Sequence, residues 1–104
     1  MAEFRQTGRD GARVVSMAGE IDLAVTDDFI AAVRDCLSQA DHVDLDFTEA
    51  TFIDSSGLGA LVLLRNEAVQ QGKQLSLMNL GTPMTRLLQI TGLESSFDIC
   101  ADHG

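Results

Sequence analysis

The sequence predicts an α/β domain with a mixed sheet of about four to five strands and with helices mostly on one face of that sheet. Segments with β character alternate with segments of helical periodicity in the order β-β-α-β-α-β-α-β. Such alternation implies parallel strands joined by right-handed crossovers. One strand near the middle of the chain also alternates apolar and acidic residues, which indicates that one face of the sheet stays in water.

Length and composition are those of one small folded domain, and residues 1–104 are interpreted as a single domain. Hydrophobic residues make up 45% of the chain, which is enough for a core and excludes a disordered tail. The chain has no Trp, no Tyr and five Phe, so the core must be built mainly from aliphatic side chains.

The N-terminal segment predicts a β-hairpin. Its strands span residues 4–7 and 12–18, where Val14 and Val15 favour β structure. The connecting segment, residues 8–11, begins and ends with glycine and contains an Asp-Gly pair that tolerates positive φ.

The central part of the chain predicts a helix followed by a strand. The helix is expected to start with Thr26 as its cap and with Asp27 and Asp28 at the positive end of its dipole. Its apolar residues recur at helical spacing and form one stripe: Phe29, Val33, Cys36, Leu37 and Ala40. The strand over residues 42–47 points two sets of side chains to opposite faces: Val43, Leu45 and Phe47 to one, Asp44 and Asp46 to the other.

The C-terminal half predicts two more helices and two more strands. In order they are a helix from Ser55 or Ser56 to about Gln71, a strand over residues 74–79, a helix from Thr82 to Gly92 and a short strand over residues 97–100. Gly72 and Gly92 are the expected helix stops. Thr82 is the expected cap of the last helix because Pro83 fits the first helical position. Residues 101–104 are expected to be frayed.

The charge of the chain limits its partners. The formal net charge is −9, from 16 acidic residues against seven Lys and Arg. This argues against nucleic acid, whose phosphates need clustered basic side chains, and against an anionic membrane. It allows a basic protein partner, although solubility alone is a sufficient reason for such a charge. With no membrane-spanning stretch and no signal-peptide pattern, a cytoplasmic location is expected.

Motifs of catalysis and of cofactor binding are missing. The glycines at 57 and 59 lack the third glycine of a dinucleotide fingerprint, and no glycine stands two residues before either serine of 55–56, as a nucleophile elbow requires. A catalytic triad would need His103 or His42, and His42 is interpreted as a surface residue. No enzyme activity, cofactor or metal is therefore expected.

The cysteines and the strand acids also have ordinary structural interpretations. Cys36 and Cys100 are too few and too far apart for a disulfide scaffold or a zinc site. Cys36 is interpreted as a small buried hydrophobe, with a redox pair between the two cysteines as the alternative. Asp44 and Asp46 are interpreted as a solvated face rather than as a site for a hard cation.

The most informative segment is Phe-Ile-Asp-Ser-Ser-Gly-Leu-Gly-Ala-Leu at residues 52–61, between a β-rich run and a helical apolar run. Ser55 is expected at the helix start, where a capping hydroxyl faces the unpaired amides of the first turn. Three features go beyond a structural cap. Asp54 directly precedes the serine, two glycines follow at a cost of about 1 kcal/mol each in a helix, and Leu58 is expected to lie exposed between them as an apolar anchor.

Ser55 is interpreted as a phosphorylation switch. A phosphate there would lie at a helix N-terminus, where the dipole and the free N–H groups favour an anion. It would add a charge of about −1.5 to −2 beside Asp54. The expected consequence is loss of a docking partner with little change in the fold.

Three blocks of the chain carry a family resemblance. They are Ile53-Asp54-Ser55-Ser56-Gly57-Leu58-Gly59, Ala18-Gly19-Glu20-Ile21-Asp22, and Thr85-Arg86-Leu87-Leu88 with Ile90-Thr91-Gly92-Leu93. Together they resemble the anti-sigma factor antagonists, a bacterial family whose fold is called the STAS domain. One block alone is weak evidence, but the three stand in the family's order, and the resemblance covers essentially the whole chain.

The resemblance implies a function. An anti-sigma factor that is itself a serine kinase would phosphorylate Ser55. The bare antagonist would bind that kinase and free the sigma factor, the phosphorylated form would not bind, and a metal-dependent serine phosphatase would reset the switch. The docking surface would include Asp22, Asp54, Ser56, Gly57, Leu58 and Gly59. A monomer without catalysis of its own is expected, with the family's final helix shortened or missing.

Two alternatives remain open from the sequence. A STAS domain can serve another complex, such as a sensory assembly or the small partner subunit of a lipid transporter, without using the serine. A small-ligand or nucleotide-binding module could use the helix N-terminus as an anion site. The Asp54-Ser55-Ser56-Gly57 sequence favours the switch over both.

Overall fold

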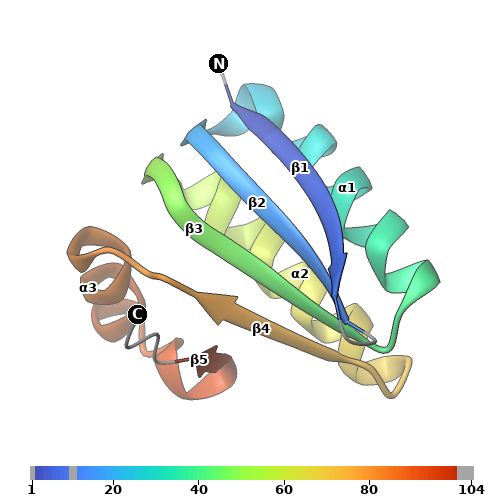
Figure 1. Cartoon of the computed structure of the whole chain (residues 1–104). Helices are drawn as coiled ribbons and strands as arrows, with labels where there is room; N and C mark the ends of the chain where they lie inside the picture. The colour runs from blue at the N-terminus through green and yellow to red at the C-terminus, as the bar shows by residue number, and fades with distance from the viewer. Residues whose placement is uncertain (1, 10–11, 101–104) are drawn as a thin grey trace.

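The computed structural model describes residues 2–9 and 12–100 and contains a five-stranded mixed sheet with strand order β1-β2-β3-β4-β5 (Figure 1). Its strands are β1 (Glu3–Arg9), β2 (Ala12–Ile21), β3 (His42–Ile53), β4 (Gln74–Met78) and β5 (Asp98–Cys100). The first two form an antiparallel hairpin and the remaining neighbours pair in parallel, which confirms the predicted class. Parts of the chain predicted as turn or frayed end, residues 10–11 and 101–104, lie outside the described residues.

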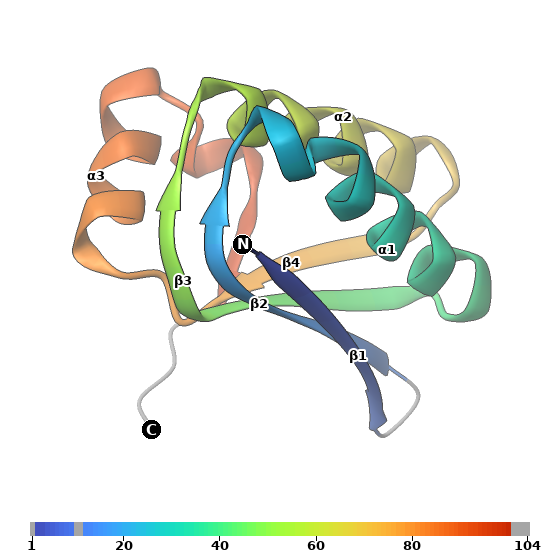
Figure 2. The same ribbon diagram turned by 90° about the horizontal axis from the view of Figure 1, so that it is seen from above.

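Two long helices, α1 (Thr26–Gln39) and α2 (Ser55–Gln70), cover one face of the sheet (Figure 2). The shorter α3 (Thr82–Thr91) lies apart from them, beside the C-terminal half of β3. Two 3₁₀ turns, η1 (Leu23–Val25) and η2 (Glu94–Ser96), complete the described elements. None of the helices in the described part of the chain is long and apolar enough to cross a membrane.

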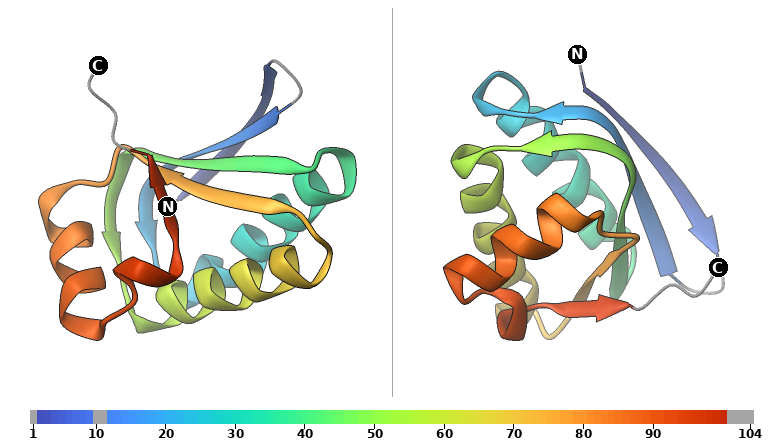
Figure 3. Two further views of the ribbon diagram at one scale, coloured as in Figure 1. Left: turned by 90° about the horizontal axis from the view of Figure 1, so that it is seen from below. Right: turned by 90° about the vertical axis from the view of Figure 1, so that its left-hand side faces the viewer.

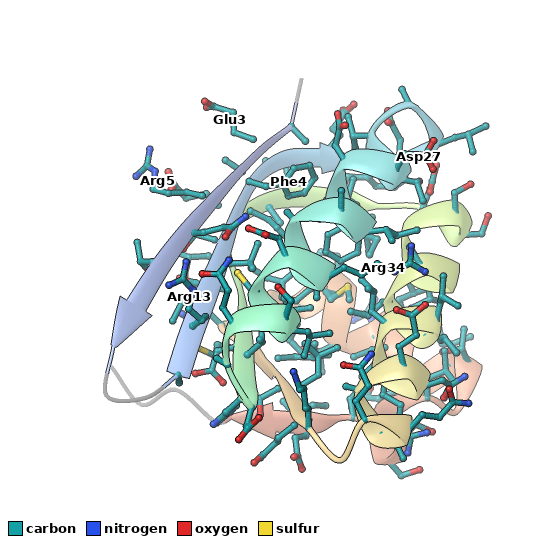
Figure 4. The ribbon with its side chains drawn as sticks, turned by 90° about the vertical axis from the view of Figure 1, so that its right-hand side faces the viewer. Glu3, Phe4, Arg5, Arg13, Asp27 and Arg34 are labelled. Atoms are coloured by element: carbon teal, nitrogen blue, oxygen red, sulfur yellow. The ribbon has the colours of Figure 1, made fainter. Side chains whose placement is uncertain are left out.

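The core lies between the sheet and the two long helices and is mainly aliphatic, as the composition predicts. The predicted stripe of α1 is buried at Phe29, Val33, Cys36 and Leu37. Phe4 of β1 stacks on Phe29 with ring centroids 5.7 Å apart, and it points toward α1 while Glu3 and Arg5 point away from the helices (Figure 4). Burying each large apolar side chain contributes about 1.5–3 kcal/mol to folding.

The helix stops are as predicted, but two predicted caps are wrong. Gly72 and Gly92 adopt positive φ values of 70° and 74° after α2 and α3. Thr26 does not cap α1, because its hydroxyl donates to the carbonyl oxygen of Asp22 at 2.9 Å. Thr82 does not cap α3 either, since Gly81 occupies that position and no side chain bonds the first turn.

β3 is six residues longer than the predicted 42–47 strand. Its pairing with β2 shifts register between Ser16 and Ala18 and again between Gly19 and Glu20. Such bulges insert extra residues and bend the strand, so the simple alternation of the first half does not continue. As a result, the C-terminal halves of β2 and β3 bend toward the N-terminal end of α2 (Figure 3).

The sheet face without α1 and α2 is less solvated than the sequence predicts. Asp44 is only 5% exposed, so its assignment to a wet face is wrong. It lies between β2 and β4, with the Nε2 atom of His42 at 2.8 Å from its Oδ1 and with buried Ser76 close to the same nitrogen. Asp46 is half-buried: burial opposes its ionisation, but hydrogen bonds from Thr48 and Asn79 prevail and lower the pKa of its carboxyl group.

Candidate functional site

The strongest candidate site lies where β2 and β3 end side by side. Asp22 follows β2 and Asp54 follows β3, and the two chain segments are joined by a 3.2 Å hydrogen bond from the Asp54 N–H to the Ile21 carbonyl oxygen. The carboxyl ends of parallel strands are the usual place for a site, because the loops and helix starts that follow them converge there. α2 begins at this edge with Ser55.

The cap of α2 is Asp54, which corrects the expectation that Ser55 fills this role. Asp54 has extended backbone angles, and its Oδ1 accepts from the Gly57 N–H at 3.0 Å. Its carbonyl oxygen accepts from the Leu58 N–H at 2.9 Å. Ser55 is therefore the first residue of the helix rather than its cap.

The Ser55 side chain is exposed, and its hydroxyl makes no hydrogen bond to any other described residue. Since Asp54 satisfies the capping requirement, the Ser55 hydroxyl has no structural task in the first turn. It projects from the start of a 16-residue helix, where the positive end of the dipole lies. Ser55 is therefore accessible from solvent while α2 stays folded.

Leu58 is not an exposed anchor, so that expectation is wrong. Its side chain is 9% exposed and belongs to the core. Gly57 is also buried: a Cβ atom there would lie 2.7 Å from Cγ1 of Ile53 and 2.8 Å from the carbonyl oxygen of Ile21. Gly57 therefore allows α2 to pack closely on the strand ends, whereas Gly59 is exposed with no atom within 4 Å of an added Cβ.

The remaining predicted docking residues lie near Ser55 or at the neighbouring strand end. Ser56 and Asp22 are half-buried, and Oδ1 of Asp22 accepts from the Ala24 N–H at 3.1 Å, which caps η1. The structure adds two apolar residues that the sequence reasoning did not assign to the site, Leu23 at 74% exposure and Phe52 at 54%. The signal in the sequence was an apolar residue within two positions of the acidic residue that follows each strand: Leu23 comes directly after Asp22, and Phe52 stands two residues before Asp54.

The chain segments that form the two strand ends and the start of α2 carry acidic side chains but no basic ones. No Lys or Arg stands between Val14 and Val33 or between Val43 and Leu64, and the structure describes both ranges in full. These two ranges include three acidic residues at the strand ends, Glu20, Asp22 and Asp54, and Glu49 within β3. The surface around Ser55 therefore favours a basic partner.

Among the described residues, the histidine and the serine that a catalytic triad would need lie far apart. His42 starts β3, while Ser55 follows the end of that 12-residue strand, so the two lie at opposite ends of it. His103 lies outside the described residues. Within residues 2–9 and 12–100, no group of three or more His, Cys, Asp or Glu side chains could hold a metal ion.

Cys36 behaves as the buried hydrophobe that the sequence predicts. Its thiol is free and buried and lies 3.2 Å from Oε1 of Gln6. Burial raises the pKa of the Cys36 thiol, and nearby Arg13 offsets only part of this effect. A thiol of raised pKa is a poor nucleophile. α1 packs Cys36 beside β1, whereas Cys100 belongs to β5 at the opposite edge of the sheet, which argues against a redox pair.

Comparison with known proteins places this fold and site in a family. The family model for the STAS domain matches residues 3–104. The chain belongs to the STAS domain family. An anti-sigma-B factor antagonist of Bacillus subtilis is 32% identical over 84% of this chain and 80% of its own length. A STAS-domain containing protein of Pseudomonas aeruginosa is 32% identical over 82% of this chain and 84% of its own length.

Solved structures show the same fold. An anti-sigma factor antagonist from Mycobacterium paratuberculosis superposes with a TM-score of 0.87 at 22% identity, covering 99% of this chain and 88% of its own. The anti-sigma factor antagonist SpoIIAA in its unphosphorylated form gives 0.75 at 18% identity, covering 96% and 89%. This STAS domain thus shares its architecture with regulators of sigma factors.

Loss of the Asp54 cap gives a first testable prediction for this STAS domain. Asp54→Ala is expected to lower the free energy of unfolding by about 1 kcal/mol, because the Gly57 N–H loses its acceptor. Asp54→Asn keeps a side-chain oxygen and is expected to cost only a few tenths of a kcal/mol. Urea unfolding followed by circular dichroism measures both. An equal loss of unfolding free energy in the two variants would contradict the capping role of Asp54.

Proposed function

We propose that this STAS domain is an anti-sigma factor antagonist controlled by phosphorylation of Ser55. In this proposal the bare form binds an anti-sigma factor serine kinase and so releases the sigma factor, and the phosphorylated form does not bind. A separate metal-dependent serine phosphatase restores the bare form. The proposal rests on one observation above all: Ser55 is exposed at the start of α2 and is free of the capping role, which Asp54 fills.

The local electrostatics support a phosphorylation switch that changes partner binding and leaves the domain folded. A phosphate on Ser55 would lie beside helix amides whose dipole favours an anion, so the domain would tolerate it. The same phosphate would add a charge of about −1.5 to −2 to a surface that already holds Asp54. A kinase surface that fits the bare serine and its acidic neighbours would then face extra bulk and extra negative charge.

The predicted docking residues divide into two groups. Asp22, Asp54, Ser56 and Gly59 have surface that a partner can reach, and we assign them to direct contact. Leu58 and Gly57 act through packing, because they fix the position of α2 against the strand ends. The domain works in this proposal as a cytoplasmic monomer that is a substrate and a binding module, with no catalysis of its own.

A labelling experiment tests the proposal. The chain is incubated with ATP together with each candidate anti-sigma factor kinase in turn, and the modified residue is mapped by mass spectrometry. Ser55→Ala is expected to lose all labelling while it still binds the kinase, because the hydroxyl is the phosphate acceptor and not a cap. Ser95→Ala is the matched control, because Ser95 is an exposed serine in η2 outside the docking residues, and it is expected to be labelled like the parent. If Ser55→Ala is labelled as strongly as the parent, the proposed site is wrong.

A further inference from the structure

A groove of about 240 Å³ lies between the C-terminal half of β3 and the N-terminal part of α3. Its lining is mainly apolar and includes Phe47, Phe52, Ile53, Pro83, Met84 and Leu87. Phe52 remains 54% exposed beside it, so a large aromatic side chain faces solvent on a domain with few aromatics. Exposed apolar surface gathered in a hollow usually marks an interaction site.

The groove follows from the bend in β3. The two register shifts with β2 turn the end of β3 toward α2, and α3 packs beside that end. Met84 and Leu88 of α3 are buried in the core, but Leu87 stays half-buried along the groove. Helical spacing places Pro83, Leu87 and the 76% exposed Ile90 on one side of α3, which extends the apolar surface.

The groove is continuous with the Ser55 surface. Phe52 and Ile53 line it, and the next two residues of the chain are Asp54 and Ser55. The surrounding strand ends are acidic and, as described above, carry no Lys or Arg. Arg86 of α3 lines a separate hollow with Thr82 and Thr85. A partner that contacts Ser55 therefore also meets an apolar groove, and the acidic Asp54 directly follows one of its lining residues, Ile53.

We propose that the groove receives one bulky apolar side chain, flanked by basic residues, from the protein that docks at Ser55. This inference rests on the proposed function and deepens it by naming the partner's contact. The size fits this occupant: a cavity of about 150 Å³ holds a benzene ring, whereas sites for drug-sized ligands span about 300–1,000 Å³. Buried aromatic or aliphatic anchors of this kind carry most of the affinity of protein interfaces.

Short peptides test the chemistry of the groove without any kinase. The capped tripeptide Arg-Phe-Arg is titrated into the isotopically labelled domain, and NMR shifts of backbone amides and methyl groups are followed. Arg-Phe-Arg is expected to shift signals of Thr51, Phe52, Met84 and Leu87, which line the groove. Arg-Ala-Arg, which has the same charge without the anchor, is expected not to shift them. Identical shifts from both peptides, or shifts away from the groove, overturn the proposal.

A second experiment measures how variants of the groove bind the kinase that labels Ser55. Phe52→Ser removes the exposed wall of the groove and is expected to weaken kinase binding at least tenfold, and Ala50→Leu is expected to do the same by filling it. Val69→Ser is the matched control, because Val69 is 57% exposed and Phe52 is 54% exposed. Val69 stands fourteen residues after Ser55 along α2, about 21 Å away. Val69→Ser is therefore expected to change the affinity for the kinase less than twofold.

The outcomes separate the two proposals. If Ser55 is labelled but Phe52→Ser and Ala50→Leu bind as tightly as the parent, the groove proposal is wrong and the phosphorylation switch stands. If Ser55→Ala is labelled like the parent, the switch is wrong, and the tripeptide titration still decides whether the groove accepts an apolar anchor. Proton NMR spectra of each variant show that the fold is retained before binding is compared.

Discussion

Gly57→Ala is expected to lower the free energy of unfolding by about 1–3 kcal/mol, although alanine is normally the better helix former. The new Cβ atom would lie 2.8 Å from the carbonyl oxygen of Ile21 and 2.7 Å from the Ile53 side chain. Ile53 can move, but the Ile21 carbonyl is backbone and accepts the hydrogen bond from Asp54. Relief of the clash must therefore shift α2 away from the strand ends.

The same helix provides a matched control two residues later. Gly59 is exposed, and an added Cβ atom there would meet nothing within 4 Å. Gly59→Ala is therefore expected to raise the free energy of unfolding by about 0.5–1 kcal/mol, since only the helix propensity changes. Urea unfolding of both variants gives the comparison. If Gly57→Ala were as stable as Gly59→Ala, close packing of α2 on the strand ends would not be the reason for this glycine.

The order and type of the elements could be predicted because each has a strong local signal. Pro83 near the start of α3 and Gly92 at its end are examples, and the stripe of α1 is another. The length of β3 had no such signal. Its second half depends on bulges in the pairing with β2, and these are set by contacts between strands rather than by the sequence of one strand.

The start of α2 shows why the cap was assigned one residue too late. Asp and Ser are both good caps, so local preference does not choose between Asp54 and Ser55. The choice is made by a tertiary contact, the hydrogen bond from the Asp54 N–H to Ile21, which fixes where the chain leaves the sheet. The corrected start strengthens the site assignment, because it leaves Ser55 free.

The orientation of α2 could not be predicted either. Residues 58 and 60–64 are all apolar, so the helix shows no clear polar face in its first half. Periodicity therefore did not reveal that Leu58 faces the core and Gly59 faces solvent. The groove beside Phe52 could not be predicted from the sequence either, because its two walls come from β3 and α3, about thirty residues apart in the chain.

Phosphorylation of Ser55 is expected to weaken kinase binding roughly a hundredfold, or about 3 kcal/mol, because like charges brought together at an interface cost several kcal/mol. Ser55→Asp adds less charge and bulk than a phosphate does, and its affinity for the kinase is expected to fall about tenfold. Ser55→Asn has a similar size without charge and separates steric from electrostatic effects. Each form is expected to melt close to the parent, since an anion at the start of α2 is favoured by the helix dipole.

Isothermal titration of the kinase with bare and fully phosphorylated protein measures this difference directly. Part of the effect is electrostatic, so the gap between Ser55→Asp and Ser55→Asn should narrow as ionic strength rises. If the effect were steric, Ser55→Asp and Ser55→Asn would lose the same affinity for the kinase at every salt concentration. Because Asp54 already places one negative charge next to Ser55, the partner must tolerate that charge and reject the second one. Equal affinity of the bare and phosphorylated forms would show that Ser55 does not control docking.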